Sequence, residues 1–164
     1  MAYTVYSLVG AQPIANTETT QKHNLGTIVK GYDPTYGEAE FIYLLGVAST
    51  AVGSVVTYNA TTWQTALAAV GANKPQPVAI AMSANVASQY GWYQISGVAV
   101  VKKTCTVSLA ANAAVGVLTT GLIAGTGSGK EVQGALVAAV ASATAGRTTV
   151  QVVMNRPHMQ GRVT

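Results

Sequence analysis

The chain has 164 residues, which is the size of one globular domain, and 49% of them are hydrophobic. Only 9% are charged, against about 25% in an average soluble domain, and this composition excludes a disordered chain, because disorder combines low hydrophobicity with high charge. The formal net charge of +4 comes from scarce acids rather than dense bases, so it does not argue for a nucleic-acid partner.

The two ends predict arms without a regular core pattern. Residues 1–24 are expected to form an extended N-terminal arm, since residues 10–24 show neither helical nor strand periodicity and contain Pro13. Residues 155–164 are expected to form a C-terminal tail, because Arg156 precedes Pro157, which favours extended geometry and blocks a helix. Residues 25–154 between them are predicted to be a single β domain.

Turn residues recur about every ten positions within that domain, which is typical of short strands. We therefore predict an all-β fold, a small barrel or sandwich. The expected strands cover residues 27–30, 40–47, 54–58, 78–82, 92–101, 106–109, 132–140 and 148–154. Residues 62–70 are rich enough in alanine to form either a helix or a strand, whereas the alanine-rich stretch 135–145 alternates and is predicted as a strand.

A weak internal repeat runs through the domain. Residues 51–57 are similar to residues 114–120, and residues 78–95 are similar to residues 136–152. Two similar β-units that together close one barrel or sandwich without a free edge would explain the similarity. Coincidence in a sequence of low complexity would explain it as well, and the sequence leaves both interpretations open.

The segment Gly125–Lys130 has the sequence GTGSGK, which looks like a phosphate-binding loop. Ala124 stands where that loop needs a glycine, and Glu131 stands where it needs a hydroxyl for magnesium. The segment is therefore predicted to be a glycine-rich turn.

No metal, cofactor or disulfide is expected. His23 and His158 are the only histidines, and neither has a second histidine, a cysteine or a carboxylate at the spacing of metal ligands. Cys105 is the only cysteine, and isolated cysteines are usually buried as small hydrophobic residues. No apolar run reaches the roughly 18 residues of a membrane span, and Met1–Gln12 has no basic residue ahead of an apolar stretch, so we expect neither a membrane anchor nor a secretion signal.

Two groups of residues are candidates for a binding surface. Glu38 and Glu40 lie two apart and share one face of a strand, as paired carboxylates for acid–base work would. A carbohydrate or peptide platform could include them with Asp33 and the aromatic residues Tyr32, Tyr36, Phe41 and Tyr43. A polar turn that enters a strand is the simpler interpretation, and we favour it.

Three long segments carry a resemblance to a known family. Residues 25–56 contain "AVG" before a strand, residues 78–100 contain the aromatic strand "YGWYQ", and residues 129–162 repeat the pattern of small residues. Over about residues 25–162 the chain resembles small head decoration, or cement, proteins of tailed bacteriophages. The resemblance implies a β-rich protein without enzymatic activity. It also implies synthesis in the host cytoplasm and a place in the virion, on the capsid exterior at capsomer junctions.

We therefore expect a structural virion protein that binds the major capsid protein and stabilises the shell. Self-association is also expected, with a homotrimer favoured and a dimer as the other option. Capsid contacts are predicted at the cationic residues of the arms, because such groups pair with carboxylates; they are Lys22, His23, Arg156, His158 and Arg162. The aromatic residues Tyr90, Trp92 and Tyr93 are predicted as core anchors or subunit contacts. The alternative function is a carbohydrate- or receptor-binding β-module on a phage or cell surface.

Overall fold

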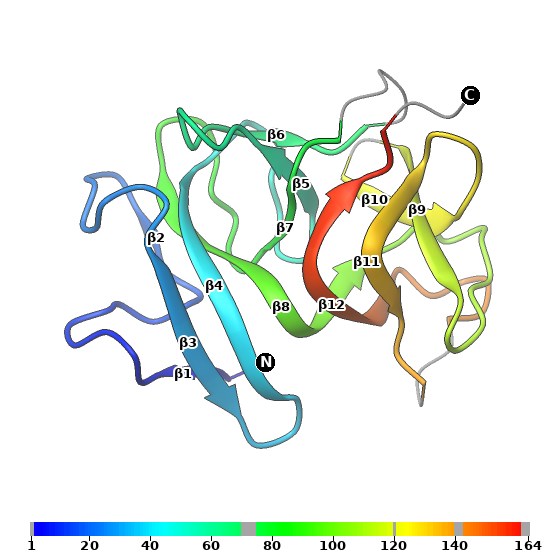
Figure 1. Cartoon of the computed structure of the whole chain (residues 1–164), viewed down its shortest axis with the longest axis horizontal. Coiled ribbons are helices and arrows are strands. Elements are labelled where there is room, and N and C mark those ends of the chain that lie inside the picture. Colours follow the sequence, from blue (N-terminus) through cyan, green and yellow to red (C-terminus); the bar gives the residue numbers. More distant parts are fainter. Residues whose placement is uncertain (1, 70–74, 120, 140–142, 162–164) are drawn as a thin grey trace.

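The computed structural model describes residues 2–69, 75–119, 121–139 and 143–161, and these residues form β-strands and no helix. The twelve strands belong to one antiparallel sheet that is not closed, so the all-β prediction is confirmed (Figure 1). The strands are β1 (Thr4–Val5), β2 (Thr17–Glu18), β3 (Ile28–Asp33), β4 (Gly37–Leu45), β5 (Val55–Tyr58), β6 (Thr65–Leu67), β7 (Val78–Ala81), β8 (Tyr90–Lys102), β9 (Ala114–Thr119), β10 (Leu122–Gly125), β11 (Glu131–Val137) and β12 (Thr149–Met159).

Strand β8 is the longest, with 13 residues, and it connects the two sides of the sheet (Figure 1). Its first half pairs with β4 from Tyr90 to Ser96, and its second half pairs with β12 from Ser96 to Lys102. Gly97 lies where the two halves meet and has a φ of +92°, and a Cβ there would lie 2.6 Å from the carbonyl oxygen of Glu38. Only glycine combines this backbone conformation with so close an approach of β4.

The strands β5–β8 and β9–β12 form two units with the same strand order. The first unit runs β6-β5-β7-β8 across the sheet and the second runs β10-β9-β11-β12, with every pairing antiparallel. In each unit an isolated parallel bridge links the hairpin to the strand that precedes it. These bridges are Leu45 with Gln64 and Lys103 with Ile123, so the second lies 58 and 59 residues further along the chain. The internal repeat therefore corresponds to two similar units, but these units do not close the sheet.

Several predicted strand positions need correction. Residues 65–67 of the ambiguous alanine-rich stretch form strand β6, because pairing with β5 and the hydrogen bond from Thr65 Oγ1 to the Leu45 carbonyl (2.8 Å) outweigh local helix propensity. Residues 106–109 are not a strand; only Leu109 makes a bridge, to Ala143. Strands β9 and β10 lie in a stretch where no strand was predicted. The strand predicted over residues 132–140 is strand β11, which ends earlier, at Val137; residues 140–142 lie outside the described residues.

Three clusters of buried residues form the core. The largest lies within the two units and consists mainly of valine, alanine, isoleucine and methionine. The second gathers Tyr3, Phe41, Tyr43 and Trp92 beneath the N-terminal segment, and the third packs Tyr93 and its neighbours between β4 and β7. Trp92 and Tyr93 have no exposed surface in the single chain, so they are core anchors and not subunit contacts; Tyr90 is half-buried.

The N-terminal segment is packed on the sheet. Strand β2 pairs with β8, and Tyr3 and Ile14 are buried among the aromatic residues of the second cluster. At the other end, β12 continues five residues beyond the predicted strand end to Met159, so the tail does not begin at Asn155. The strand survives Pro157 because a bulge opposite Gly134 breaks the register there, and pairing resumes at His158.

Asp33 fastens the beginning of the chain to the turn between β3 and β4. Its carboxylate accepts hydrogen bonds from the backbone N–H groups of Ala2 (2.7 Å), Thr35 (2.8 Å) and Tyr36 (3.1 Å). Burial of this carboxylate alone would raise its pKa, but the three donors outweigh burial and lower the pKa below the usual value.

Asp33 makes the stability of the fold sensitive to acid. A carboxyl whose pKa is lowered by folding contributes stability above its unfolded pKa of about 3.9, and loses it as the pH falls through the folded pKa. We expect the urea midpoint of the wild type to decrease as the pH is lowered below about 4. Asp33→Asn should show a smaller decrease. Glu18→Gln is the control and should keep the full decrease; an identical pH profile for Asp33→Asn would contradict the role of Asp33.

Burial of Trp92 predicts a large loss of stability on truncation. Trp92→Ala should lower the free energy of unfolding by about 3–5 kcal/mol, since a large cavity forms in the core. Urea unfolding at several protein concentrations measures this loss, and it should be the same at each. A loss that appears only at concentrations where copies associate would instead place Trp92 at a subunit contact.

Candidate functional site

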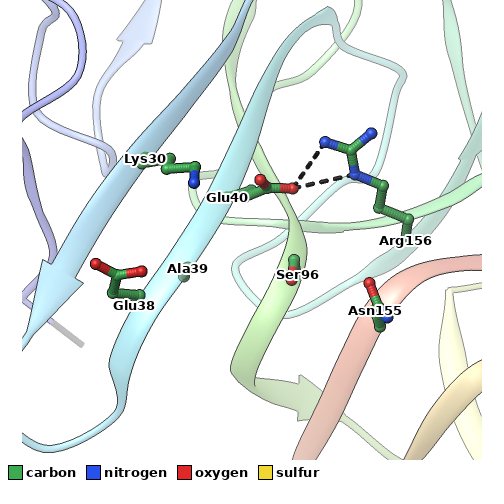
Figure 2. Close-up of a pocket in the computed structure, with 7 residues that line it drawn as sticks. All are labelled: Lys30, Glu38, Ala39, Glu40, Ser96, Asn155 and Arg156. Atoms are coloured by element: carbon green, nitrogen blue, oxygen red, sulfur yellow. Dashed lines mark hydrogen bonds and ion pairs between the residues drawn. The ribbon is translucent and has the colours of Figure 1, made fainter.

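A polar groove lies where β4, β8 and β12 meet (Figure 2). Its volume is about 250 Å³, and its lining comes from four strands. The lining residues are Lys30, Glu38, Ala39, Glu40, Ser96, Asn155 and Arg156. Two cations and two carboxylates therefore face one another with balanced charge, and Ser96 and Asn155 add neutral polar groups.

Arg156 reaches this groove because of the bulge in β12. Gln133 pairs with His158 and Ala135 pairs with Met154, so three residues of β12 lie opposite the single residue Gly134. Within the bulge Arg156 adopts a φ of +42°, a left-handed conformation that is unusual for a residue with a side chain. Bulges re-aim side chains, and this one turns the guanidinium towards β4.

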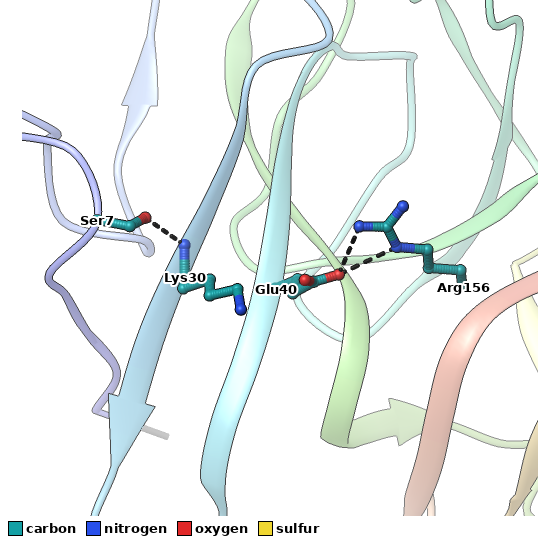
Figure 3. Close-up of polar contacts among 4 residues, drawn as sticks. All are labelled: Ser7, Lys30, Glu40 and Arg156. Atoms are coloured by element: carbon teal, nitrogen blue, oxygen red, sulfur yellow. Dashed lines mark hydrogen bonds and ion pairs between the residues drawn. The ribbon is translucent and has the colours of Figure 1, made fainter.

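The guanidinium forms an ion pair with Glu40 (Figure 3). Nη2 lies 3.0 Å and Nε lies 3.1 Å from the same oxygen, Oε2. The side chain of Arg156 is 61% exposed and that of Glu40 is 22% exposed. The pair joins residues 116 positions apart and links the first part of the sheet to the second unit.

Glu38 and Glu40 do not act as a pair of free carboxylates. Glu38 accepts a hydrogen bond from the Tyr6 hydroxyl at 3.0 Å, and Glu40 is held by Arg156. The hydrogen bond to Glu38 raises the pKa of Tyr6. The two carboxylates are thus fixed by different partners, and the arrangement is that of a polar surface rather than of an acid–base pair.

The groove is the centre of a larger surface, which we call the outer face. Cross-strand pairs place Lys30 beside Glu40, Glu40 beside Ser96, and Ser96 beside Asn155. Because side chains two apart on a strand share a face, the same face continues along β3 from Lys30 to Ile28 and Tyr32, and along β12 from Asn155 to Val153. On β4 it ends at Glu40, because Ile42 and Leu44 are buried in the third core cluster. The outer face consists of Tyr6, Ile28, Lys30, Tyr32, Glu38, Glu40, Ser96, Val98, Leu136, Val153, Asn155 and Arg156.

Exposed apolar side chains gather on this face. Eight large hydrophobic residues are exposed in the part of the chain that the structure describes, and five of them, Tyr6, Ile28, Tyr32, Leu136 and Val153, belong to the outer face. Leu136 and Val153 are direct cross-strand partners. Single exposed hydrophobic residues are common on soluble proteins, but a group on one sheet face indicates an interaction surface.

A second hollow lies between the N-terminal segment and the domain. This N-terminal groove has a volume of about 330 Å³ and a mainly apolar lining. Its lining residues are Ala2, Tyr3, Pro13, Ile14, Ala15, Val52 and Met82. Val52 at its rim is 58% exposed, and Val9 of the same segment is fully exposed.

The predicted capsid-contact residues do not form one site. Lys22 and His23 lie near Tyr43, whose hydroxyl accepts a hydrogen bond from the Lys22 backbone and whose ring contacts the His23 imidazole. His158 lies near the end of β12, within hydrogen-bond distance of Gln133 (2.9 Å). Arg156 pairs with Glu40, and Arg162 lies outside the described residues.

The predicted aromatic platform is also divided. Phe41 and Tyr43 have no exposed surface, so they cannot contact a ligand, and Tyr36 is half-buried. Tyr32 is exposed, and the aromatic residue that accompanies it on the outer face is Tyr6. Sequence analysis did not single out Tyr6, because nothing in the sequence shows that β1 pairs with β3.

Two other expectations concern reactive groups. Cys105 is exposed, contrary to the expected burial, because it lies in the turn after β8 rather than in a strand. Within the segment Gly125–Lys130, Gly125 ends β10 and residues 126–130 form the predicted turn before β11, so a strand follows it rather than the helix of a phosphate-binding loop.

Within the described residues, no three histidine, cysteine, aspartate or glutamate side chains are placed to hold a metal ion together. The same part of the chain has no helix that is long and apolar enough to cross a membrane. Comparison with known proteins found no matching family model, no matching curated protein and no matching solved structure.

The unusual backbone of Arg156 can be tested with two substitutions. Arg156→Ala and Arg156→Gly both remove the exposed ion pair, which is worth at most about 1 kcal/mol. Glycine adopts the left-handed conformation without strain, so Arg156→Gly should be more stable than Arg156→Ala by about 1 kcal/mol in urea unfolding. Equal stability of the two variants would show that residue 156 is not held in this conformation in solution.

Proposed function

We propose that this chain is a capsid decoration protein of a tailed bacteriophage, which binds the outer surface of the shell at capsomer junctions and stabilises it. The N-terminal groove is the observation that supports this function best. It is an apolar hollow of about 330 Å³ with an exposed valine at its rim, and such hollows accept apolar side chains of a partner protein. The partner in this proposal is the major capsid protein.

The covering of the aromatic core by the N-terminal segment also supports a binding role for this side of the molecule. Tyr3 and Ile14 fix the segment from below, while Val9 and Lys22 remain exposed on it. A repeating shell offers many equivalent sites, so a modest contact per copy suffices when copies bind side by side. Few charged residues and many small ones suit close contact with such a surface.

Filling the N-terminal groove tests the proposal without removing any side chain of the core. Ala15 is exposed and lines the groove, so Ala15→Phe should occupy it and lower binding to expanded shells at least tenfold in co-sedimentation. Ala60→Phe places the same side chain at an exposed position outside the groove and should bind like the wild type.

Deleting residues 1–24 is a poorer test than filling the groove. The deletion would remove Tyr3 and Ile14 from the second core cluster and expose Phe41, Tyr43 and Trp92. Wild-type occupancy of Ala15→Phe on shells would show that the N-terminal groove is not the contact. Failure of the wild-type chain to bind expanded shells at all would contradict the function itself.

A further inference from the structure

We propose that the outer face is the contact between two copies of this chain in a two-fold symmetric dimer. The proposal does not rest on the decoration function, since the N-terminal groove and the outer face are lined by different residues. It replaces the expected contact through Trp92 and Tyr93, which are buried within one copy.

The first argument is the composition of the face. Tyr6, Tyr32 and Ile28 are exposed by 54%, 51% and 44% on one side of the polar groove, and Leu136 and Val153 are exposed on the other. Tyrosine and arginine are enriched in protein interfaces, where the centre of the patch loses its water. The three remaining exposed large hydrophobic residues, Val9, Val52 and Val86, do not belong to the face.

The second argument is charge. Lys30 and Arg156 balance Glu38 and Glu40, so the face carries both signs and no net charge. A strongly acidic or basic partner would leave two of these groups opposed by like charge, which costs free energy. A second copy of the same face supplies both signs, and a two-fold axis can place Lys30 of each copy opposite Glu38 of the other.

The third argument is shape. The face is one side of a sheet, and two such sides pack as aligned sheets about 10 Å apart, as in a β-sandwich. Face-to-face packing uses the same patch on both copies and therefore gives a dimer rather than the trimer favoured from the sequence. Because the face holds only twelve residues, fewer than the roughly 20–30 of a standard interface, we expect dissociation in the micromolar range.

Charge reversal gives a test that loss of folding cannot imitate. Lys30→Glu alone sets a new carboxylate against Glu38 of the other copy, and Glu38→Lys alone sets two ammonium groups together. Each variant should therefore be monomeric in sedimentation equilibrium at concentrations where the wild type is dimeric. An equimolar mixture of the two variants brings opposite charges together again, and it should form heterodimers.

Control variants separate this face from the rest of the surface. Tyr32→Asp should abolish the dimer, whereas Val86→Asp changes an exposed hydrophobic residue elsewhere and should leave it intact. Lys130→Glu is the control for charge, since Lys130 lies in the turn before β11. Urea unfolding of each variant shows whether the fold is kept.

Three results would overturn the proposal. The wild type could remain monomeric throughout the micromolar range, Tyr32→Asp could still dimerise, or the mixture of charge-reversed variants could stay monomeric. A monomeric wild type whose outer-face variants no longer bind shells would assign this face to the capsid protein. Loss of shell binding by Ala15→Phe with an intact dimer would leave the dimer proposal standing.

Discussion

The structure depends on strand β8, which joins the first unit to the second. Strand β8 pairs with β4 and β7 in its first half and with β12 in its second half. It therefore connects the strands of the first unit to those of the second. Gly97 permits this change of partner, because any side chain there would collide with the carbonyl oxygen of Glu38 and with Ala39. If β4 could not approach at this point, Glu40 and Arg156 would not meet, and the groove at the centre of the outer face would not form.

Small residues make the close packing around this strand possible. A Cβ at Gly91 would collide with the side-chain amide of Asn85, and a Cβ at Gly46 would collide with the backbone carbonyl oxygen of Asn85. The loop before β8 therefore packs closely against Gly91 of β8 and against Gly46, which follows β4. Asn85 of this loop is fully buried beside Tyr93. Burial raises the pKa of the Tyr93 hydroxyl to about 12, so this group stays protonated over the whole range in which the protein would be studied.

The sequence predicts local structure well and long-range structure poorly in this chain. The spacing of turn residues identified β4, β5, β7 and most of β8, because short apolar runs between turn residues are typical of strands. The strand beyond Pro157 and the pairing of β1 with β3 depend on partners far away along the chain, and proline or a two-residue strand carries no local sign of them. The same limit applies to the site: Glu40 and Arg156 were each singled out, but for different roles, since only the bulge at Gly134 brings them together.

The low charge content of the chain favours association through a face as small as the outer face. With 9 basic and 5 acidic residues in 164, copies of this chain carry a low net charge, so the proposed association through a small apolar surface meets little electrostatic repulsion. Two of the five acids lie on the outer face, and a third, Asp33, is used inside the turn that leads to it. Three of the five acidic side chains therefore either stabilise the β3–β4 turn or lie beside the cations of the outer face. Two of these few carboxylates line one groove with Lys30 and Arg156, and in the proposed dimer this arrangement favours a second face of the same mixed charge over a strongly acidic or basic partner.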